Sequence, residues 1–317
     1  MSTIEVSFPS GGETVRGDLY LPSGTGPFPA VVMAGGWCYV KELRQPRYAE
    51  AFAAKGIAAL VFDYRRLGAS DGEPRQHLDP WDQIEDYQNA ISYLEGRNQV
   101  DGERIGAWGI SYSGGHVLIL AAVEPRIKAI VSNVPVVKGY ETMWRVHGSE
   151  GLRRLQRLIL EDRKKRFQSE PHGYLPMSQD PSRGLSTWPF EEVRRVFDEL
   201  QRTQAPRHDH RSTIESTELL MRYDVFPFLK RNVNTPTLMV VAEADDITMW
   251  DLEIEAFNQI PCQTKKLLIL PKTSHMTLYS NLTALDLAAA AASSWLAEHL
   301  VELPSIEKSM RHYSSDR

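Results

Sequence analysis

The stretch Arg104–His116 constrains the fold of this chain more than any other. An apolar run, typical of a buried strand, stops at Ser111 between Gly109 and Ser113, and an apolar helix-like segment, Val117–Val123, follows. This pattern predicts a strand, a tight turn and a helix. A serine on such a turn is strained and needs small neighbours two positions away on either side. Ser111 is therefore a candidate nucleophile, although a glycine-rich turn before an ordinary helix fits the motif alone equally well.

Composition narrows the class of protein. At 317 residues the chain exceeds the usual size of one domain, so we expect a single α/β core that carries an insertion. A net charge of −5 gives no overall basic field, which argues against nucleic acid as a partner. The start of the chain has no basic, apolar leader, and charged residues interrupt the apolar segment 284–300, so we expect a cytoplasmic protein without a membrane span. Cys38 and Cys262 offer no disulfide framework and no metal-ligand spacing, and we expect both to be reduced.

The order of elements predicts a mostly parallel, doubly wound sheet. Residues 4–21 alternate apolar and polar around Ser10–Gly12, as an edge hairpin does, and continuous apolar runs then alternate with helical segments. We expect a final helix to open near Thr283, capped by its hydroxyl with Asp286 three residues later. The predicted buried strands after the hairpin are 30–33, 57–62, the strand before Ser111, 127–131, 237–242 and 266–270, and the predicted core helices are 46–55, 79–96, the one after Ser111 and 250–259.

The alternation breaks between about Gly139 and Arg231. This region is basic, aromatic and punctuated by proline, with helical stretches near 150–168 and 189–203 and no buried strand. We therefore predict a helical cap at 139–231 over the carboxyl edge of the sheet, where open α/β folds bind ligands. The core would then comprise residues 1–138 and 232–302, and residues 303–317 would form a C-terminal tail.

An acid and a histidine follow two later strands. Asp245 comes after strand 237–242, with Glu243 and Asp246 as competing acids, and His275 comes after strand 266–270. A serine hydroxyl needs a base to accept its proton, and the base needs an acid to fix its tautomer. The chain order Ser111, Asp245, His275 is that of the α/β-hydrolase fold, whereas a lone histidine would more often be a structural residue.

On these residues the chain resembles the α/β-hydrolase superfamily over nearly its whole length. The run Val61–Arg65, followed by Gly68, Ser70 and Gly72, is similar to the stretch after the fourth strand in many of these hydrolases. The elbow Gly109–Gly115 and the ending His275–Tyr279 are similar to dienelactone-hydrolase-like esterases and to fungal polyketide-releasing hydrolases and acyltransferases. X-prolyl peptidases and cocaine-esterase-like enzymes share the Ile-Ser-Tyr elbow. By this resemblance the acid lies three residues past Ala242, which favours Asp245.

The resemblance also implies an oxyanion hole. Tyr112, which follows the nucleophile at a helix start, would supply one backbone amide, and Trp37 would by register supply the second. Relatives often read His-Gly at that turn, whereas this chain reads Gly35-Gly36, so only the backbone role carries over. We interpret Cys38, beside this turn, as a packed bystander, because no histidine lies on a matching turn.

Three further groups have a functional and a structural interpretation. Tyr140, Trp144 and Trp188, together with Tyr174 and Phe190, either line an acyl pocket under the cap or pack inside the cap itself. His208-Asp209-His210 resembles a metal motif, but we expect two solvated histidines. A basic run is either a solvated face or a docking surface for an acidic acyl-carrier protein or a coenzyme A thioester; it comprises Arg153, Arg154, Arg157, Arg163, Lys164, Lys165 and Arg166.

The sequence thus predicts a serine hydrolase that acts on an ester, thioester or lactone of a small-molecule acyl substrate and needs no cofactor. Serine at the elbow argues against haloalkane or epoxide chemistry, for which relatives of this fold use a carboxylate. The alternatives are an acyltransferase or polyketide-releasing thioesterase with the same triad, a peptidase, and a ligand-binding protein of the same fold. The oligomeric state stays open, with a homodimer as one option.

Overall fold

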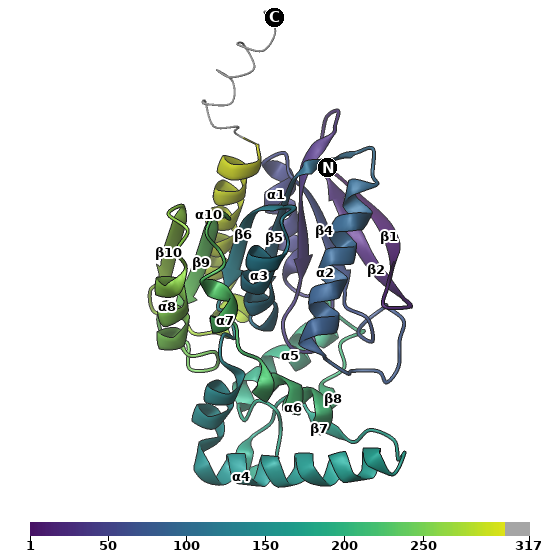
Figure 1. Ribbon diagram of the computed structural model, residues 1–317, viewed down its shortest axis with the longest axis vertical. Helices are drawn as coiled ribbons and strands as arrows, with labels where there is room; N and C mark the ends of the chain where they lie inside the picture. Colours follow the sequence, from purple (N-terminus) through teal and green to yellow (C-terminus); the bar gives the residue numbers. More distant parts are fainter. Residues whose placement is uncertain (302–317) are drawn as a thin grey trace, which may run out of the picture.

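An eight-stranded sheet runs through the centre of the computed structural model, which describes residues 1–301 (Figure 1). The strand order is β1-β2-β4-β3-β5-β6-β9-β10. The tail predicted at 303–317 lies outside the described residues. The strands of this sheet are β1 (Ser2–Ser10), β2 (Glu13–Leu21), β3 (Phe28–Ala34), β4 (Ala58–Asp63), β5 (Val100–Ile110), β6 (Ile127–Asn133), β9 (Thr237–Ala242) and β10 (Lys265–Leu270).

The pairing within this sheet follows the sequence pattern. β1 and β2 form the predicted edge hairpin, and β2 pairs with β4 in the antiparallel direction. All later neighbours, from β4 across to β10, are parallel. β3 and β4 are buried along almost their entire length because helices cover both faces, which is why they read as continuous apolar runs. The carboxyl ends of the parallel strands therefore meet at one edge of the sheet.

Helices cover the two faces of the sheet (Figure 1). α1 (Gln45–Ala54) and α10 (Leu282–Leu300) pack on one face, and α2 (Pro80–Glu95) and α3 (Tyr112–Val123) pack on the other. α8 (Trp250–Gln259) follows β9, and the short α9 (Thr277–Ser280) precedes α10. Within residues 1–301, no helix combines the length and the apolar character that a bilayer span requires.

The predicted N-cap residue of helix α10, Thr283, is wrong by two positions. Asn281 caps this helix, because its side chain accepts hydrogen bonds from the amides of Thr283 and Ala284. Thr283 is therefore already inside the first turn, and Asp286 pairs with Arg47 of α1 instead of taking part in a capping box. Asparagine is at least as good an N-cap as threonine, and at Asn281 its side chain reaches two free amides of the first turn.

The segment 139–231, which we call the cap, adds no strand to the central sheet and lies below its carboxyl edge in Figure 1. The expectation of a purely helical cap is wrong, because β7 and β8 form a two-stranded antiparallel sheet. Gly148, at φ 61°, breaks the long helix α4 into two parts. The elements of the cap are α4 (Gly139–Phe167), β7 (Tyr174–Pro176), a 3-10 turn (Pro181–Arg183), α5 (Glu191–Thr203), β8 (Arg211–Thr213), α6 (Ile214–Arg222) and α7 (Phe226–Leu229).

Candidate active site

Ser111 lies on the turn between β5 and α3 in a strained conformation. Its φ of 59° and ψ of −118° fall outside the regions that a non-glycine residue readily adopts. The turn has no room for side chains beside it: a Cβ on Gly109 would lie 2.2 Å from the carbonyl oxygen of Ser113, and one on Gly36 would lie 2.8 Å from Cβ of Ser111. The strain and the tight packing together match the predicted nucleophile elbow.

Ser113 replaces the final glycine of the motif and fastens the elbow. Its hydroxyl accepts a hydrogen bond from the amide of Ile110 at 2.9 Å and donates one to the carbonyl of Ala34 at 2.8 Å. Ala34 ends β3, directly before the Gly35-Gly36 turn. The elbow and that turn are therefore held against each other, which brings the backbone of Gly36 next to Ser111.

Asp245 and His275 form a buried pair at the ends of β9 and β10. Nδ1 of His275 lies 2.7 Å from Oδ2 of Asp245, and both side chains are nearly inaccessible to solvent. The other carboxylate oxygen of Asp245 accepts hydrogen bonds from the amides of Ile247 and Thr248. Burial alone would raise the pKa of Asp245, but His275 and the Thr248 amide outweigh it and hold the pKa below 3.8. The lowered pKa favours the ionised form of Asp245, whose contact with Nδ1 fixes the orientation of the His275 imidazole.

The competing acids are placed elsewhere. Glu243 is exposed and accepts a hydrogen bond from the amide of Lys272, and Asp246 is also exposed. His116 follows Ser111 closely in sequence, but its two ring nitrogens contact Tyr223 and Gln83, both at 2.9 Å. Burial lowers the pKa of His116 to about 3, so it is a satisfied, neutral core histidine.

Ser111 and His275 line the same small cavity between core and cap. The cavity volume is about 20 Å³, which is room for one water molecule or little more. Its remaining wall is apolar and aromatic. The core contributes Trp37, Tyr39, Ile247, Met276 and Tyr279, and the cap contributes Met177, Trp188, Val193 and Phe197.

The two residues predicted to supply the oxyanion hole flank Ser111. Tyr112 is the first residue of α3, where backbone amides have no acceptor within the helix. Trp37 follows Gly36 on the turn that touches Ser111, and its ring lies 5.2 Å from that of Tyr112. Both side chains are buried, which fixes the two backbone segments. The amides of Trp37 and Tyr112 are thus candidates for the donors, and that role stays a prediction.

The aromatic residues predicted to line the acyl pocket divide into two groups. Trp188 is 3% exposed and lies in the cavity wall. The prediction is wrong for Tyr140 and Trp144, which are 54% and 47% exposed on the first turns of α4 and are absent from that wall. Tyr174 is also exposed, and Phe190 packs partly buried against the core. Aromatic composition does not reveal which way a helix faces, so the sequence could not separate these groups.

Apart from Trp188, the residues of the cap that reach the cavity were not predicted from the sequence. Val193 and Phe197 belong to a buried stripe on α5 that also includes Val196 and Leu200. Their spacing of i, i+3, i+4 and i+7 is the signal of an amphipathic helix, and it could have identified the inward face of α5. Thr248 was also missed: its hydroxyl lies 3.2 Å from Nδ1 of His275 and donates to Glu253 at 2.7 Å. No short motif marks that contact.

Cys38 and the histidine pair do not form a reactive or metal site. Cys38 is 1% exposed, its thiol contacts the carbonyl of Arg211, and burial raises its pKa well above 9.0. The expectation that His208 and His210 are solvated is wrong. His208 contacts the carbonyl of Cys38 and the ring of His210, which in turn contacts Ser178. Burial lowers the pKa of each histidine to about 4, and the pair tethers the cap to the turn after β3.

The basic run on α4 is largely paired with acids. Arg153 pairs with Glu150, Arg163 pairs with Glu218, and Arg166 pairs with Asp162 at 2.8 Å. Arg154, Lys164 and Lys165 are exposed. Several of the predicted docking cations therefore have partners within the cap.

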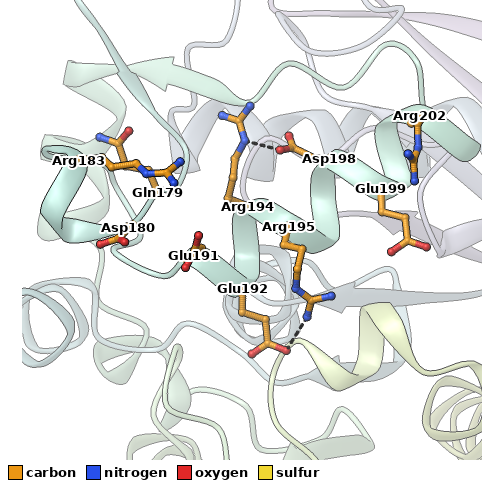
Figure 2. A pocket seen from close by; sticks show the side chains of 10 residues that line it. All are labelled: Gln179, Asp180, Arg183, Glu191, Glu192, Arg194, Arg195, Asp198, Glu199 and Arg202. Carbon is orange, nitrogen blue, oxygen red and sulfur yellow. Dashed lines mark hydrogen bonds and ion pairs between the residues drawn. The ribbon is translucent and has the colours of Figure 1, made fainter.

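A surface groove of about 1220 Å³ lies on the outer face of α5 (Figure 2). Its wall is charged and of mixed sign, and its side chains pair with one another, as Arg194 does with Asp198 at 2.7 Å and Arg195 with Glu192 at 3.6 Å. None of the predicted catalytic residues lines it. The groove lies on one face of α5, and the small cavity lined by Ser111 and His275 lies on the opposite face.

Several known proteins are similar to this chain in sequence or in fold. The model of the X-Pro dipeptidyl-peptidase (S15) family matches residues 11–277. The thiohydrolase aneE of Aspergillus aculeatus is 31% identical over 256 residues, which cover 79% of each chain. The acyltransferase drtE of Aspergillus calidoustus is 29% identical over 250 residues, covering 78% of this chain and 79% of its own. The alpha/beta hydrolase GrgF from Penicillium sp. sh18 has a similar fold, with a TM-score of 0.80 at 24% identity and coverage of 95% and 100%.

Proposed function

Because the chain belongs to the S15 family and has the α/β-hydrolase fold, we propose that it cleaves a carboxylic ester, thioester or lactone through an acyl-enzyme on Ser111. Relatives named a thiohydrolase and an acyltransferase support an enzyme that acts on ester-type bonds. The observation that carries the proposal is the 2.7 Å contact between His275 and Asp245, with His275 and the strained Ser111 in one cavity wall. The location of the protein in the cytoplasm stays a prediction.

In the proposed reaction Oγ of Ser111 attacks the carbonyl carbon while Nε2 of His275 accepts its proton. The resulting oxyanion is stabilised by the amides of Trp37 and Tyr112, which would contribute about 2.7–4 kcal/mol each to lowering the barrier. His275 then protonates the leaving group, and Asp245 stabilises the imidazolium throughout. Water, activated by the same histidine, releases the acid and restores the Ser111 hydroxyl.

Acyl transfer is the second candidate. The apolar and aromatic wall beside Ser111 suits an organic alcohol or amine as the group that attacks the acyl-enzyme in place of water. The relative named an acyltransferase supports the same alternative. Peptide hydrolysis and passive ligand binding remain alternatives that the experiment below separates.

The test is a panel of esters, thioesters, lactones and an X-Pro peptide of graded size, assayed with the wild type and with Ser111→Ala. We expect sustained turnover of ester-type substrates, an acyl adduct on the Ser111 peptide by mass spectrometry, and a loss of about 10⁴-fold or more in kcat in the variant. Cys38→Ala is the matched control and should retain activity, because its thiol is buried and inert. Adding an alcohol or amine and measuring how the acyl group partitions separates transfer from hydrolysis. If turnover is low and Ser111→Ala does not change it, the proposed enzymatic function is wrong.

A further inference from the structure

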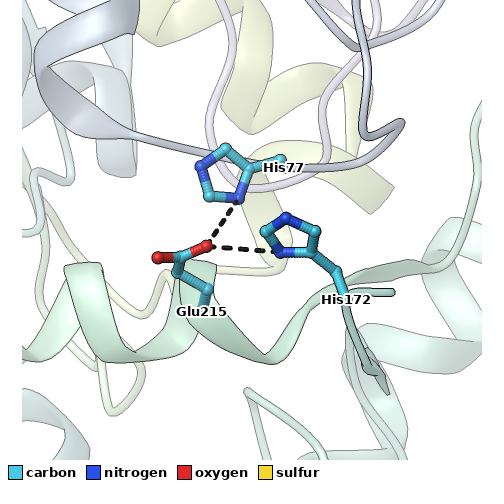
Figure 3. A group of neighbouring side chains, drawn as sticks. All are labelled: His77, His172 and Glu215. Atoms are coloured by element: carbon cyan, nitrogen blue, oxygen red, sulfur yellow. Dashed lines mark ion pairs between the residues drawn. The ribbon is translucent and has the colours of Figure 1, made fainter. Parts of the chain in front are cut away.

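Two histidines and a carboxylate meet where the cap touches the core, away from the catalytic cavity (Figure 3). His77 lies in the core segment between β4 and α2, His172 lies between α4 and β7, and Glu215 lies in the first turn of α6. Three elements far apart in sequence therefore place their side chains together. One ligand atom of each residue, a ring nitrogen of each histidine and a carboxylate oxygen of the glutamate, lies within 4.8 Å of the other two.

The spacing of these atoms suits a small divalent cation. Nδ1 of His172 is 3.3 Å from Oε2 of Glu215, and Nδ1 of His77 is 4.0 Å from the same oxygen. Ligands around tetrahedral zinc, at about 2.0–2.1 Å from the metal, are about 3.4 Å apart. The His172–Glu215 pair already has this separation, whereas His77 must move closer to both of the other residues, whose ligand atoms lie within 4.8 Å of its own. Figure 3 shows both rings directed toward the carboxylate.

The hydrogen bonding of the three residues leaves ligand atoms available. Nδ1 of His172 is buried and has no hydrogen-bond partner among residues 1–301. Oε1 of Glu215 accepts a hydrogen bond from Arg166 at 2.6 Å, which turns Oε2 toward the histidines, as partners of metal ligands commonly do. The charge of Arg166 is offset by Asp162, at 2.8 Å. Nδ1 of His77 contacts the Thr213 hydroxyl at 2.9 Å, and coordination would replace this contact while Thr213 keeps Ser216 as a partner.

We propose that His77, His172 and Glu215 bind a zinc ion, with water as the fourth ligand, and that this ion fastens the cap to the core. Histidine nitrogen and carboxylate oxygen are ligands that zinc prefers. The surrounding contacts already join the same two parts: the amide of Thr213 donates to the carbonyl of Gln76 at 3.0 Å, and the amide of Leu78 donates to Ser216 at 2.7 Å. The ion would act at this junction and take no part in acyl chemistry, so the proposal is independent of the proposed function.

The test is a calorimetric titration with zinc chloride near neutral pH, using the full chain after chelator treatment and removal of any affinity tag. We expect one zinc ion per chain and a rise in melting temperature on binding. His172→Ala and Glu215→Gln change partly exposed side chains, so both variants should fold, which circular dichroism checks. Each should weaken zinc binding at least about tenfold. His299→Ala, on α10, is the matched control and should bind as the wild type does.

Two outcomes would overturn the site. If the wild type takes up no zinc, the three residues form only side-chain contacts between the cap and the core. If both variants bind zinc as the wild type and His299→Ala do, the ion binds elsewhere on the surface. The absorption of bound Co²⁺ gives a second readout, since its visible bands should be intense in the wild type and lost in His172→Ala if the site is tetrahedral.

Discussion

Glu253 is a fully buried carboxyl group that the proposed reaction does not use. It lies on α8, where its Oε1 accepts a hydrogen bond from the Thr248 hydroxyl at 2.7 Å. That hydroxyl lies 3.2 Å from Nδ1 of His275, and the amide of Thr248 donates to Asp245. Burial raises the pKa of Glu253 well above 4.5, and the charge of Asp245 raises it further. The raised pKa favours the neutral form of Glu253, which contacts the Asp245–His275 pair through Thr248.

This assignment predicts how Glu253→Gln alters the pH dependence of stability. An acid whose pKa is raised by folding makes the folded state lose stability as pH rises above the unfolded pKa, here 4.5, until the folded pKa is passed. Each unit between the two pKa values corresponds to about 1.4 kcal/mol. Glutamine has no such loss, so the wild type should become less stable relative to Glu253→Gln as pH rises, while kcat near neutral pH stays similar. Urea unfolding of both proteins across this range checks it, and a difference independent of pH would mean that Glu253 is ionised in the fold.

Single residues at the elbow could be predicted only in part. The motif indicates that position 113 must be small, and Ser113 satisfies this requirement. It does not indicate that the Ser113 hydroxyl bonds to Ala34 of β3, because that contact depends on two strands becoming neighbours. The Thr248 contact to His275 has the same origin. The sequence predicted which type of residue these positions need, but it did not predict which atom each polar group would bond to.

At the scale of elements, α5 separates the catalytic cavity from the outer groove. Its inward face carries Val193 and Phe197, and its outward face carries ion pairs such as that of Arg194 with Asp198. The cavity of about 20 Å³ is too small for an acyl chain, so side chains on this inward face must yield when substrate binds. The size of these side chains should therefore determine which acyl groups are accepted.

Two substitutions on α5 test this role. Val193 and Val196 are both 3% exposed, but only Val193 lines the cavity. Val193→Ala should raise kcat/KM for longer acyl chains relative to acetyl by about tenfold, because two methyl groups leave the wall. Val196→Ala is the matched control: it should lose comparable stability and keep the wild-type preference. Measuring kcat/KM over aryl esters of increasing chain length decides the matter, and equal profiles for the two variants would show that α5 does not select the acyl group.

The strands and helices of the core were predictable because the spacing of apolar residues within each segment reflects which of its faces are buried. Strands covered on both faces read as apolar runs, and α8 occupies the predicted range 250–259. The cap was harder. β7 and β8 have three residues each, which is too short for alternation to appear, and they exist because they pair with each other across the 34 residues of intervening chain, 177–210. The kink at Gly148 interrupts the helical periodicity, so the sequence predicted only the part of α4 that follows it.

For the whole molecule, topology is what made the candidate triad readable. The carboxyl ends of parallel strands meet at one edge, so residues following β5, β9 and β10 had to lie near one another wherever they stood in the chain. The contacts between cap and core follow no such rule. Two features depend on how the cap packs against the core: the set of side chains that line the cavity, and the grouping of His77, His172 and Glu215. No local pattern in the sequence encodes this packing.

The run Val61–Arg65, which the resemblance singled out, holds three distant parts of the molecule together. Asp86 of α2 accepts hydrogen bonds from the Ser10 hydroxyl at 2.5 Å, from the amide of Arg65 at 2.9 Å and from Nε of Arg65 at 2.7 Å. Asp86 is fully buried and Arg65 is 5% exposed, so these groups cannot turn to water. The network joins the edge hairpin, the segment after β4 and α2.

Asp86→Ala should therefore lower the free energy of unfolding by about 3–5 kcal/mol, because it leaves buried donors on Ser10 and Arg65 without their acceptor. Glu95→Ala is the matched control on the same helix: Glu95 is 37% exposed and pairs with Arg126 at 2.8 Å, so its loss should cost about 1 kcal/mol or less. Urea unfolding followed by tryptophan fluorescence measures both. Similar losses for the two variants would mean that Glu85, 2.6 Å from Arg65, takes over as the partner of the guanidinium and that the hairpin is held by apolar packing alone.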